Sequence, residues 1–176
     1  MRARRVAVAT LGATIIVTAI ARASTIQEFQ IQGLKGDTPD TWQTETPTSP
    51  LRDAQMSLPG SGGPAELAII FFGAGAGGDS EANIARWIRQ MDPQTGQPVL
   101  EQFTVGSFSV KFIDVSGTLK PSSMTVEPKT PRPHSRLFGA IVEGSSGRWF
   151  FKATGPADTM QEQRDAFLTF LKSLHK

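Results

Sequence analysis

The sequence predicts an α+β domain with a mainly antiparallel sheet and two helices. Its short apolar runs are separated by turns such as Pro59–Pro64 and Gly144–Gly147 rather than by helices. Consecutive hairpins of this kind favour antiparallel pairing over alternating βα units. Each expected helix has apolar residues three and four positions apart, and the second helix closes the chain.

The first half of the chain contains three expected strands and one helix. Phe29 and Ile31 alternate with glutamines, which is typical of a half-buried strand. Residues 53–58 and 66–72 form an expected hairpin. A helix follows, capped by Asp79 or Ser80 and ended by the turn 92–96. Its apolar face is formed by Ile84, Trp87, Ile88 and Met91.

The second half of the chain predicts three strands, a long loop and a closing helix. The strands are expected at 105–115, 136–143 and 148–154, with a proline-rich loop at 117–135. The last helix is expected at 159–174, where Thr159 and Glu162 have the spacing of a capping box. Its predicted core stripe is Met160, Phe167, Leu168, Leu171 and Leu174.

The first 23 residues have the pattern of a secretory signal peptide. Arginines precede the uncharged stretch Val6–Ala21, and Ala21 and Ala23 supply small residues before an expected cleavage at Ser24. An uncleaved anchor is the alternative, but the stretch is shorter than the about 20 residues of a membrane span. We therefore expect a periplasmic or secreted chain without stable membrane insertion. Residues 24–50 would form an extended N-terminal segment, and 51–176 a single α+β domain.

Charge and cysteine content exclude several functions. The chain carries 18 lysines and arginines against 16 acidic residues, but four of the arginines belong to the signal. The mature chain is thus slightly acidic, which argues against nucleic-acid binding. The absence of cysteine excludes thiol catalysis, cysteine-bound zinc and iron–sulfur clusters.

A glycine-rich turn has the spacing G-x-G-x-x-G at Gly73, Gly75 and Gly78. In dinucleotide-binding proteins such a turn holds a pyrophosphate at a helix N-terminus. Here Asp79 and Glu81 follow immediately, and their charges would repel a phosphate. We therefore predict a structural connection between strand and helix, and no bound cofactor.

Catalytic and metal-binding patterns are weak. The two histidines, His134 and His175, are distant in sequence and have no serine elbow or chelating spacing, so neither a catalytic triad nor a metal site is expected. Asp114 and Glu143 each end an apolar strand. A carboxylate pair formed by these two side chains would support a periplasmic hydrolase, which is the alternative function.

The loop 117–135 is the predicted partner-binding segment. Long loops in compact domains are often functional, and this one is rich in basic residues on an otherwise mildly acidic protein. The candidate residues for partner binding are Lys120, Lys129, Arg132, His134 and Arg136. The aromatic residues are predicted to fill the core, and Trp42 to anchor the N-terminal segment.

Three pieces of the sequence resemble a family of exported bacterial proteins of unknown function. They are Pro47-Thr-Ser-Pro50-Leu-Arg52, the glycine-rich turn Phe72-Gly-x-Gly-x-Gly-Gly78 followed by Asn83-Ile-x-Arg86-Trp87, and Phe150-Phe-Lys-x-Thr-Gly155-Pro. The order of elements also resembles the PsbP-like fold of photosystem II accessory proteins. That resemblance implies an α/β/α sandwich used for protein binding.

Together these observations predict an exported, non-catalytic binding or accessory module. Its partner would be another protein or a small ligand. No residue pattern identifies which of the two it is.

Overall fold

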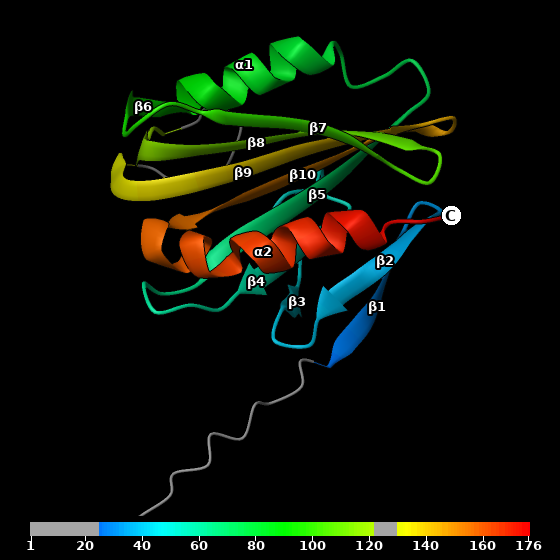
Figure 1. Cartoon of the computed structure of the whole chain (residues 1–176), viewed down its shortest axis with the longest axis horizontal. Coiled ribbons are helices and arrows are strands. Elements are labelled where there is room, and N and C mark those ends of the chain that lie inside the picture. The colour runs from blue at the N-terminus through cyan, green and yellow to red at the C-terminus, as the bar shows by residue number, and fades with distance from the viewer. Residues whose placement is uncertain (1–24, 122–129) are drawn as a thin grey trace, which may run out of the picture.

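The computed structural model describes residues 25–121 and 130–176, so the predicted signal peptide and Lys129 lie outside the described residues. Figure 1 shows a sheet with one helix on either side. In chain order the elements are β1 (Ile26–Ile31), β2 (Leu34–Pro39), β3 (Gln43–Glu45), β4 (Ala54–Leu58), β5 (Ala65–Gly73), α1 (Ser80–Gln90), β6 (Met91–Gln94), β7 (Val99–Val105), β8 (Phe108–Leu119), β9 (Arg132–Gly144), β10 (Gly147–Pro156) and α2 (Ala157–Ser173).

Within the described residues, eight strands form one sheet. Seven of them lie in the order β3-β4-β5-β10-β9-β8-β6. β7 also pairs with β8, along its first half, while β6 pairs with the end of β8. Every pairing in the sheet is antiparallel. The predicted α+β class and the antiparallel sheet are therefore confirmed.

Alternation of side chains along the strands divides the interior into two cores. On β10, Trp149 and Phe151 belong to the core beneath α2, whereas Phe150 belongs to the core beneath α1. The ring centroid of Phe150 lies 6.0 Å from that of Trp87, on α1, in an edge-to-face arrangement. The sheet thus separates two apolar layers, one under each helix.

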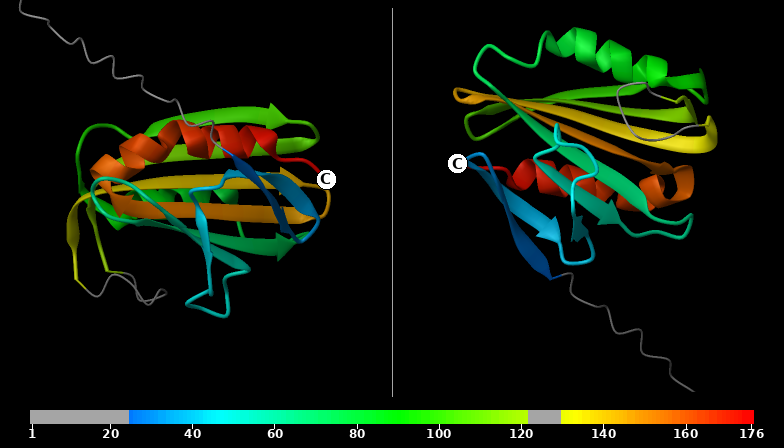
Figure 2. Two further views of the ribbon diagram at one scale, coloured as in Figure 1. Left: turned by 90° about the horizontal axis from the view of Figure 1, so that it is seen from below. Right: turned by 180° about the vertical axis from the view of Figure 1, so that it is seen from behind.

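The N-terminal segment is part of this domain. The β1–β2 hairpin lies beside the C-terminal end of α2 (Figure 2), where the Lys35 and His175 backbones exchange hydrogen bonds. Trp42 is 1% exposed, packs against Phe167 and Phe170, and donates a hydrogen bond to Gln163 at 2.8 Å. The prediction that Trp42 anchors this segment is confirmed.

The predicted boundaries are wrong around the long loop. Residues 117–119 belong to β8 and residues 132–135 to β9, and Gly117 pairs with Ser135. The prediction also missed β2, β3 and β7, and the turn expected at 92–96 contains part of β6. Proline and glycine in these segments suggested loops. The backbone pairing with a long neighbouring strand outweighs this local preference.

The predicted capping box at the last helix is also wrong. α2 begins at Ala157, and its N-cap residue, Pro156, has no side chain that could accept a hydrogen bond. Thr159 instead donates to the Gly63 carbonyl at 2.6 Å, and Glu162 accepts a hydrogen bond from the Ser61 backbone at 3.1 Å. These side chains tie α2 to the turn between β4 and β5. The prediction also missed Phe170, which is fully buried.

Candidate functional site

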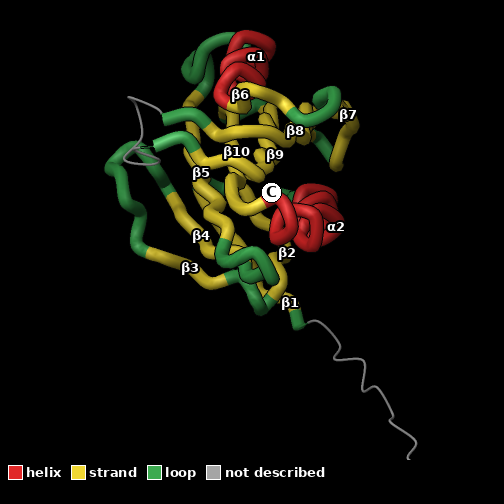
Figure 3. The backbone as a smooth tube through the Cα atoms, turned by 90° about the vertical axis from the view of Figure 1, so that its left-hand side faces the viewer, coloured by secondary structure: helices red, strands yellow, loops and turns green. Residues whose placement is uncertain are grey.

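A groove of about 870 Å³ lies on the α1 face of the sheet. α1 packs mainly against β6, β8 and β9, at one end of the sheet. Figure 3 shows β5, β4 and β3 extending away from α1 toward the other end. α1 therefore covers little of β5 and β10 on this face, where their side chains are buried or half-buried. The groove is closed on one side by α1 and on the other by residues 50–53.

The floor of the groove is apolar. It is formed by Ala68, Ile70 and Phe72 of β5 and by Phe150 of β10, with Trp87 of α1 beside them. Phe72 and Phe150 contact edge to face, with ring centroids 5.1 Å apart. The intervening residues of β5, Leu67 and Ile69, pack into the core beneath α2. Because side chains alternate along a strand, Ala68, Ile70 and Phe72 form one apolar row that faces the groove.

Two basic side chains lie over this floor without a carboxylate partner among the described residues. Lys152, on β10, donates to Gln90 at 2.6 Å, and Arg86, on α1, donates to Asn83 at 2.6 Å. Burial, together with the nearby Arg86 and Arg52 guanidinium groups, lowers the pKa of Lys152 from 10.5 to about 8. Lys152 is thus held where its own charge is unfavourable.

The margins of the groove carry ion pairs. Arg52 lies 2.9 Å from Glu66, and Lys120 pairs with Asp92. Among the residues that line the groove, four basic side chains face only two acidic ones, Asp53 and Glu66. The groove is therefore positively charged, and the cations that have no carboxylate partner among the described residues are Lys152 and Arg86, over the apolar floor.

The structure does not bring the predicted partner-binding residues together. Lys120 lines the groove, whereas Arg132 and His134 are exposed at the start of β9. Arg136 lies on the opposite face of the sheet, where it contacts Asp114 through two hydrogen bonds of 2.6 Å. Lys129 is outside the described residues. Of this set, only Lys120 belongs to the groove.

Asp114 and Glu143 do not form a carboxylate pair. Asp114 is 4% exposed and lies on the α2 face, bound by Arg136 and by Arg164 at 2.9 Å. Glu143 lies on the α1 face, where it contacts Ser80 and Arg148. A sheet separates the two carboxylates, so they cannot act on one substrate. This arrangement removes the residues on which the hydrolase alternative depended.

In the glycine-rich turn, a free backbone amide at the start of α1 is hydrogen-bonded by the chain itself. Asp79 accepts a hydrogen bond from the Ala82 amide at 2.8 Å, and Arg148 donates to the Gly78 carbonyl at 2.8 Å. The turn thus presents carbonyl oxygens to a cation, the opposite of a phosphate cradle. A Cβ on Gly77 would lie 3.0 Å from Phe72. Glycine there lets the turn pack against the groove floor.

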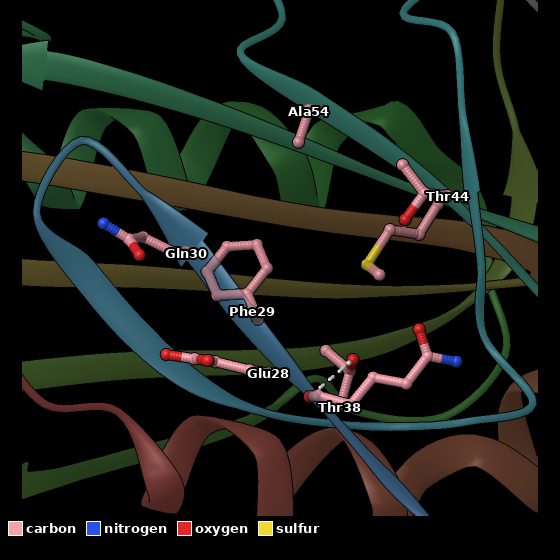
Figure 4. A pocket seen from close by; sticks show the side chains of 8 residues that line it. Glu28, Phe29, Gln30, Thr38, Thr44 and Ala54 are labelled. Carbon is pink, nitrogen blue, oxygen red and sulfur yellow. Dashed lines mark hydrogen bonds between the residues drawn. The ribbon is translucent and has the colours of Figure 1, made fainter.

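A smaller cavity of about 190 Å³ lies on the other face, beside the β1–β2 hairpin. Figure 4 shows Phe29 beside it, with Thr38 donating to the Gln27 carbonyl at 3.3 Å. Glu28 is its one charged lining residue. This cavity offers neither the size nor the unpaired cations of the groove.

Within residues 25–121 and 130–176, no cluster of three or more histidine, aspartate or glutamate side chains is placed to hold a metal ion. No helix in these ranges is long and apolar enough to cross a bilayer.

Sequence reasoning missed the groove, although a signal for it was present. Residues from three of the sequence pieces named above meet there. Pro50 to Arg52 come from the first piece, Asn83, Arg86 and Trp87 from the second, and Phe150, Lys152 and Thr154 from the third. Segments that are distant in sequence thus supply the two sides and the floor of one groove.

No protein-family model and no curated protein matches this chain. Among solved structures, PsbP (CyanoP) from the cyanobacterium Synechocystis sp. PCC 6803 is similar over 90% of this chain and 95% of its own, with 13% identity and a TM-score of 0.56. A Pseudomonas aeruginosa protein of unknown function is similar over 86% of this chain and 96% of its own, with 13% identity and a TM-score of 0.46. Identity this low carries information on fold and none on activity. The chain has the PsbP-like fold that the order of its elements predicts.

Proposed function

We propose that this chain is an exported, non-catalytic binding module that holds its ligand in the groove on the α1 face. The observation that carries the proposal is the combination of an apolar floor with two basic side chains, Lys152 and Arg86, that have no carboxylate partner among the described residues. Binding sites for small molecules are typically concave and mostly apolar, with a few polar groups that orient the ligand. Export is supported by the N-terminal pattern of basic residues, apolar stretch and small residues.

The energetics of Lys152 support a binding role. A lysine whose pKa is lowered by burial makes the folded chain less stable at neutral pH than an apolar residue would. Strongly perturbed groups in a cleft are typical of functional sites. An anionic ligand would pair with the Lys152 charge, so binding would offset the destabilisation that this lysine causes in the folded chain.

A photo-crosslinking experiment in cells tests the groove as the binding site. A crosslinking amino acid replaces Leu51, at the groove margin, or Leu100, on β7 away from the groove; both leucines are well exposed, at 66% and 58%. We expect a defined adduct, identified by mass spectrometry, from position 51 and none from position 100. The same adduct from both positions, or from position 100 alone, would show that the groove is not the binding site.

Cell fractionation tests the export component separately. We expect the protein in the periplasm or the medium, with an intact mass that begins at Ser24. A cytoplasmic protein that retains residues 1–23 would contradict export and leave the groove proposal standing.

A further inference from the structure

We infer that the groove takes a small amphipathic anion, with a single carboxylate head group and an apolar tail. This inference rests on the proposed function and specifies the class of ligand. The head would lie against Lys152 and Arg86, and the tail along the apolar row of β5 and β10. The volume of about 870 Å³ falls within the range of small-molecule sites, about 300–1,000 Å³.

The head-group position follows from the two partner-free cations. Lys152 uses one of its donors on Gln90, and Arg86 uses Nη2 on Asn83, so both retain unused donors. A carboxylate accepts several hydrogen bonds, and charged donors strengthen each of them. Glu66 also lines the groove and acts on the Lys152 charge, but it already pairs with Arg52 at 2.9 Å.

The number of charges follows from the ion pairs at the margin. Arg52 and Lys120 are neutralised by Glu66 and Asp92, so they add little attraction for a second negative charge. Asp53 also lines the groove, although it accepts hydrogen bonds from the Phe71 amide and from Gln32. Its charge would repel an extended polyanion. One anionic group is thus favoured over several.

The tail position follows from the floor. Ile70 and Phe72 are half-buried and present apolar surface to the groove, beside the buried rings of Phe150 and Trp87. A tail on this row would remove apolar surface from water, and each buried methylene would strengthen binding by about fourfold. An isolated anion such as acetate would gain none of this, so head and tail are both required.

Calorimetric titration of the mature protein with octanoate, 1-octanol and acetate tests the inference. Octanoate should bind at least about tenfold more tightly than octanol, because hydrogen bonds to charged groups contribute about 1.5–3 kcal/mol. Acetate should show no binding at millimolar concentration. Lys152→Met and Arg86→Gln should each lower octanoate affinity to that of octanol, whereas Lys111→Met, outside the groove and paired with Glu81, should not.

The three tryptophans report where octanoate binds. Trp87 is 4% exposed but lines the groove, whereas Trp42 and Trp149 are buried in the core on the other face of the sheet. In an NMR titration we expect the indole N–H signal of Trp87 to shift and the other two to remain unchanged. Equal affinity for octanoate and octanol, no binding of either, an equal loss in Lys111→Met, or a shift of Trp42 or Trp149 would overturn the inference.

The binding site and the class of ligand can be contradicted separately. If position 51 captures a ligand in cells while octanoate does not bind, the groove remains the binding site and the ligand class is wrong. If position 51 captures nothing and octanoate does not bind, both the proposed function and the ligand class are wrong.

Discussion

Lys152 is the residue at which stability and proposed binding oppose each other. Its pKa is lowered to about 8 by burial and by Arg86 and Arg52; the Glu66 carboxylate acts in the opposite direction, and Arg132 adds to the lowering. Below about pH 8 the lysine is charged in both the folded and the unfolded chain, so the full penalty on the fold is present. Between pH 8 and 10.5 the folded chain loses this proton first, and the penalty disappears.

We expect Lys152→Met to stabilise the protein at pH 7 by about 1–3 kcal/mol, because it removes a charge that the fold disfavours. The difference from the unmodified protein should shrink as pH rises from 8 to 10.5, since stability of the unmodified protein increases in that window. Urea denaturation at several pH values measures both effects. Lys111→Met is the control: its Glu81 hydrogen bond raises the pKa of Lys111, so its removal should not stabilise. A Lys152→Met protein that is less stable at every pH would contradict the account.

The loss of stability expected on removing the Asp114 side chain depends on the two arginines that contact it. It receives two hydrogen bonds of 2.6 Å from Arg136 and one of 2.9 Å from Arg164. Asp114→Ala should lower the free energy of unfolding by about 3 kcal/mol, because Arg136 loses its carboxylate partner in a largely buried position and Arg164 keeps only Glu101. Glu143→Ala, at a half-exposed pair, should cost about 1 kcal/mol or less. Chemical denaturation compares the two; equal costs would mean that the Asp114 network adds nothing beyond a surface pair.

At the scale of elements, the N-terminal segment is attached to α2 through Trp42. Its ring packs on Phe167 and Phe170, and its Nε1 donates to Gln163 at 2.8 Å. Trp42→Phe keeps an aromatic ring but removes volume and leaves Gln163 without this donor. We expect a loss of about 1–3 kcal/mol in urea denaturation. The exposed Leu100→Ala should change stability by less than about 0.5 kcal/mol. A Trp42→Phe effect as small as that of Leu100→Ala would show that Trp42 does not anchor the segment.

Elements with strong periodicity could be predicted from sequence, and edge elements could not. β5 and β10 contain continuous apolar runs, and α1 has apolar residues three and four positions apart. Each of these elements was predicted within a few residues of its bounds. β7 was missed because it lies at the edge and leaves Val99 and Leu100 exposed, which hides its alternation. The ends of β8 and β9 were missed because their pairing is a contact between distant segments.

The groove could not be predicted because no local pattern identifies it. Lys152 alternates with Phe151 and Ala153, and this alternation indicates only that Lys152 faces away from the α2 core. Whether that other face is open water or a groove depends on where α1 lies across the sheet. The loop 117–135 was predicted from its length and its basic charge, and the sheet places Lys120 and Arg136 on opposite faces.

At the scale of the whole molecule, the sheet separates a stabilising face from a proposed binding face. Trp42, Asp114 and α2 lie on one side, and Lys152, Arg86 and α1 on the other. The hydrogen-bond partners of Trp42 and Lys152 are Gln163 and Gln90, which lie on different helices. Residues without shared partners usually make additive contributions to stability. The two faces should therefore be energetically independent, even though both use β10.

The double variant Trp42→Phe/Lys152→Met tests this independence. Its change in unfolding free energy should equal the sum of the single changes within about 0.5 kcal/mol, and the two should partly cancel because they have opposite signs. Octanoate affinity should follow the groove alone: unchanged in Trp42→Phe, and equally lowered in Lys152→Met and in the double variant. Urea denaturation and calorimetry on the same four proteins supply both readings. An interaction energy above about 1 kcal/mol, or a loss of octanoate affinity in Trp42→Phe, would mean that β10 transmits packing changes from one face of the sheet to the other.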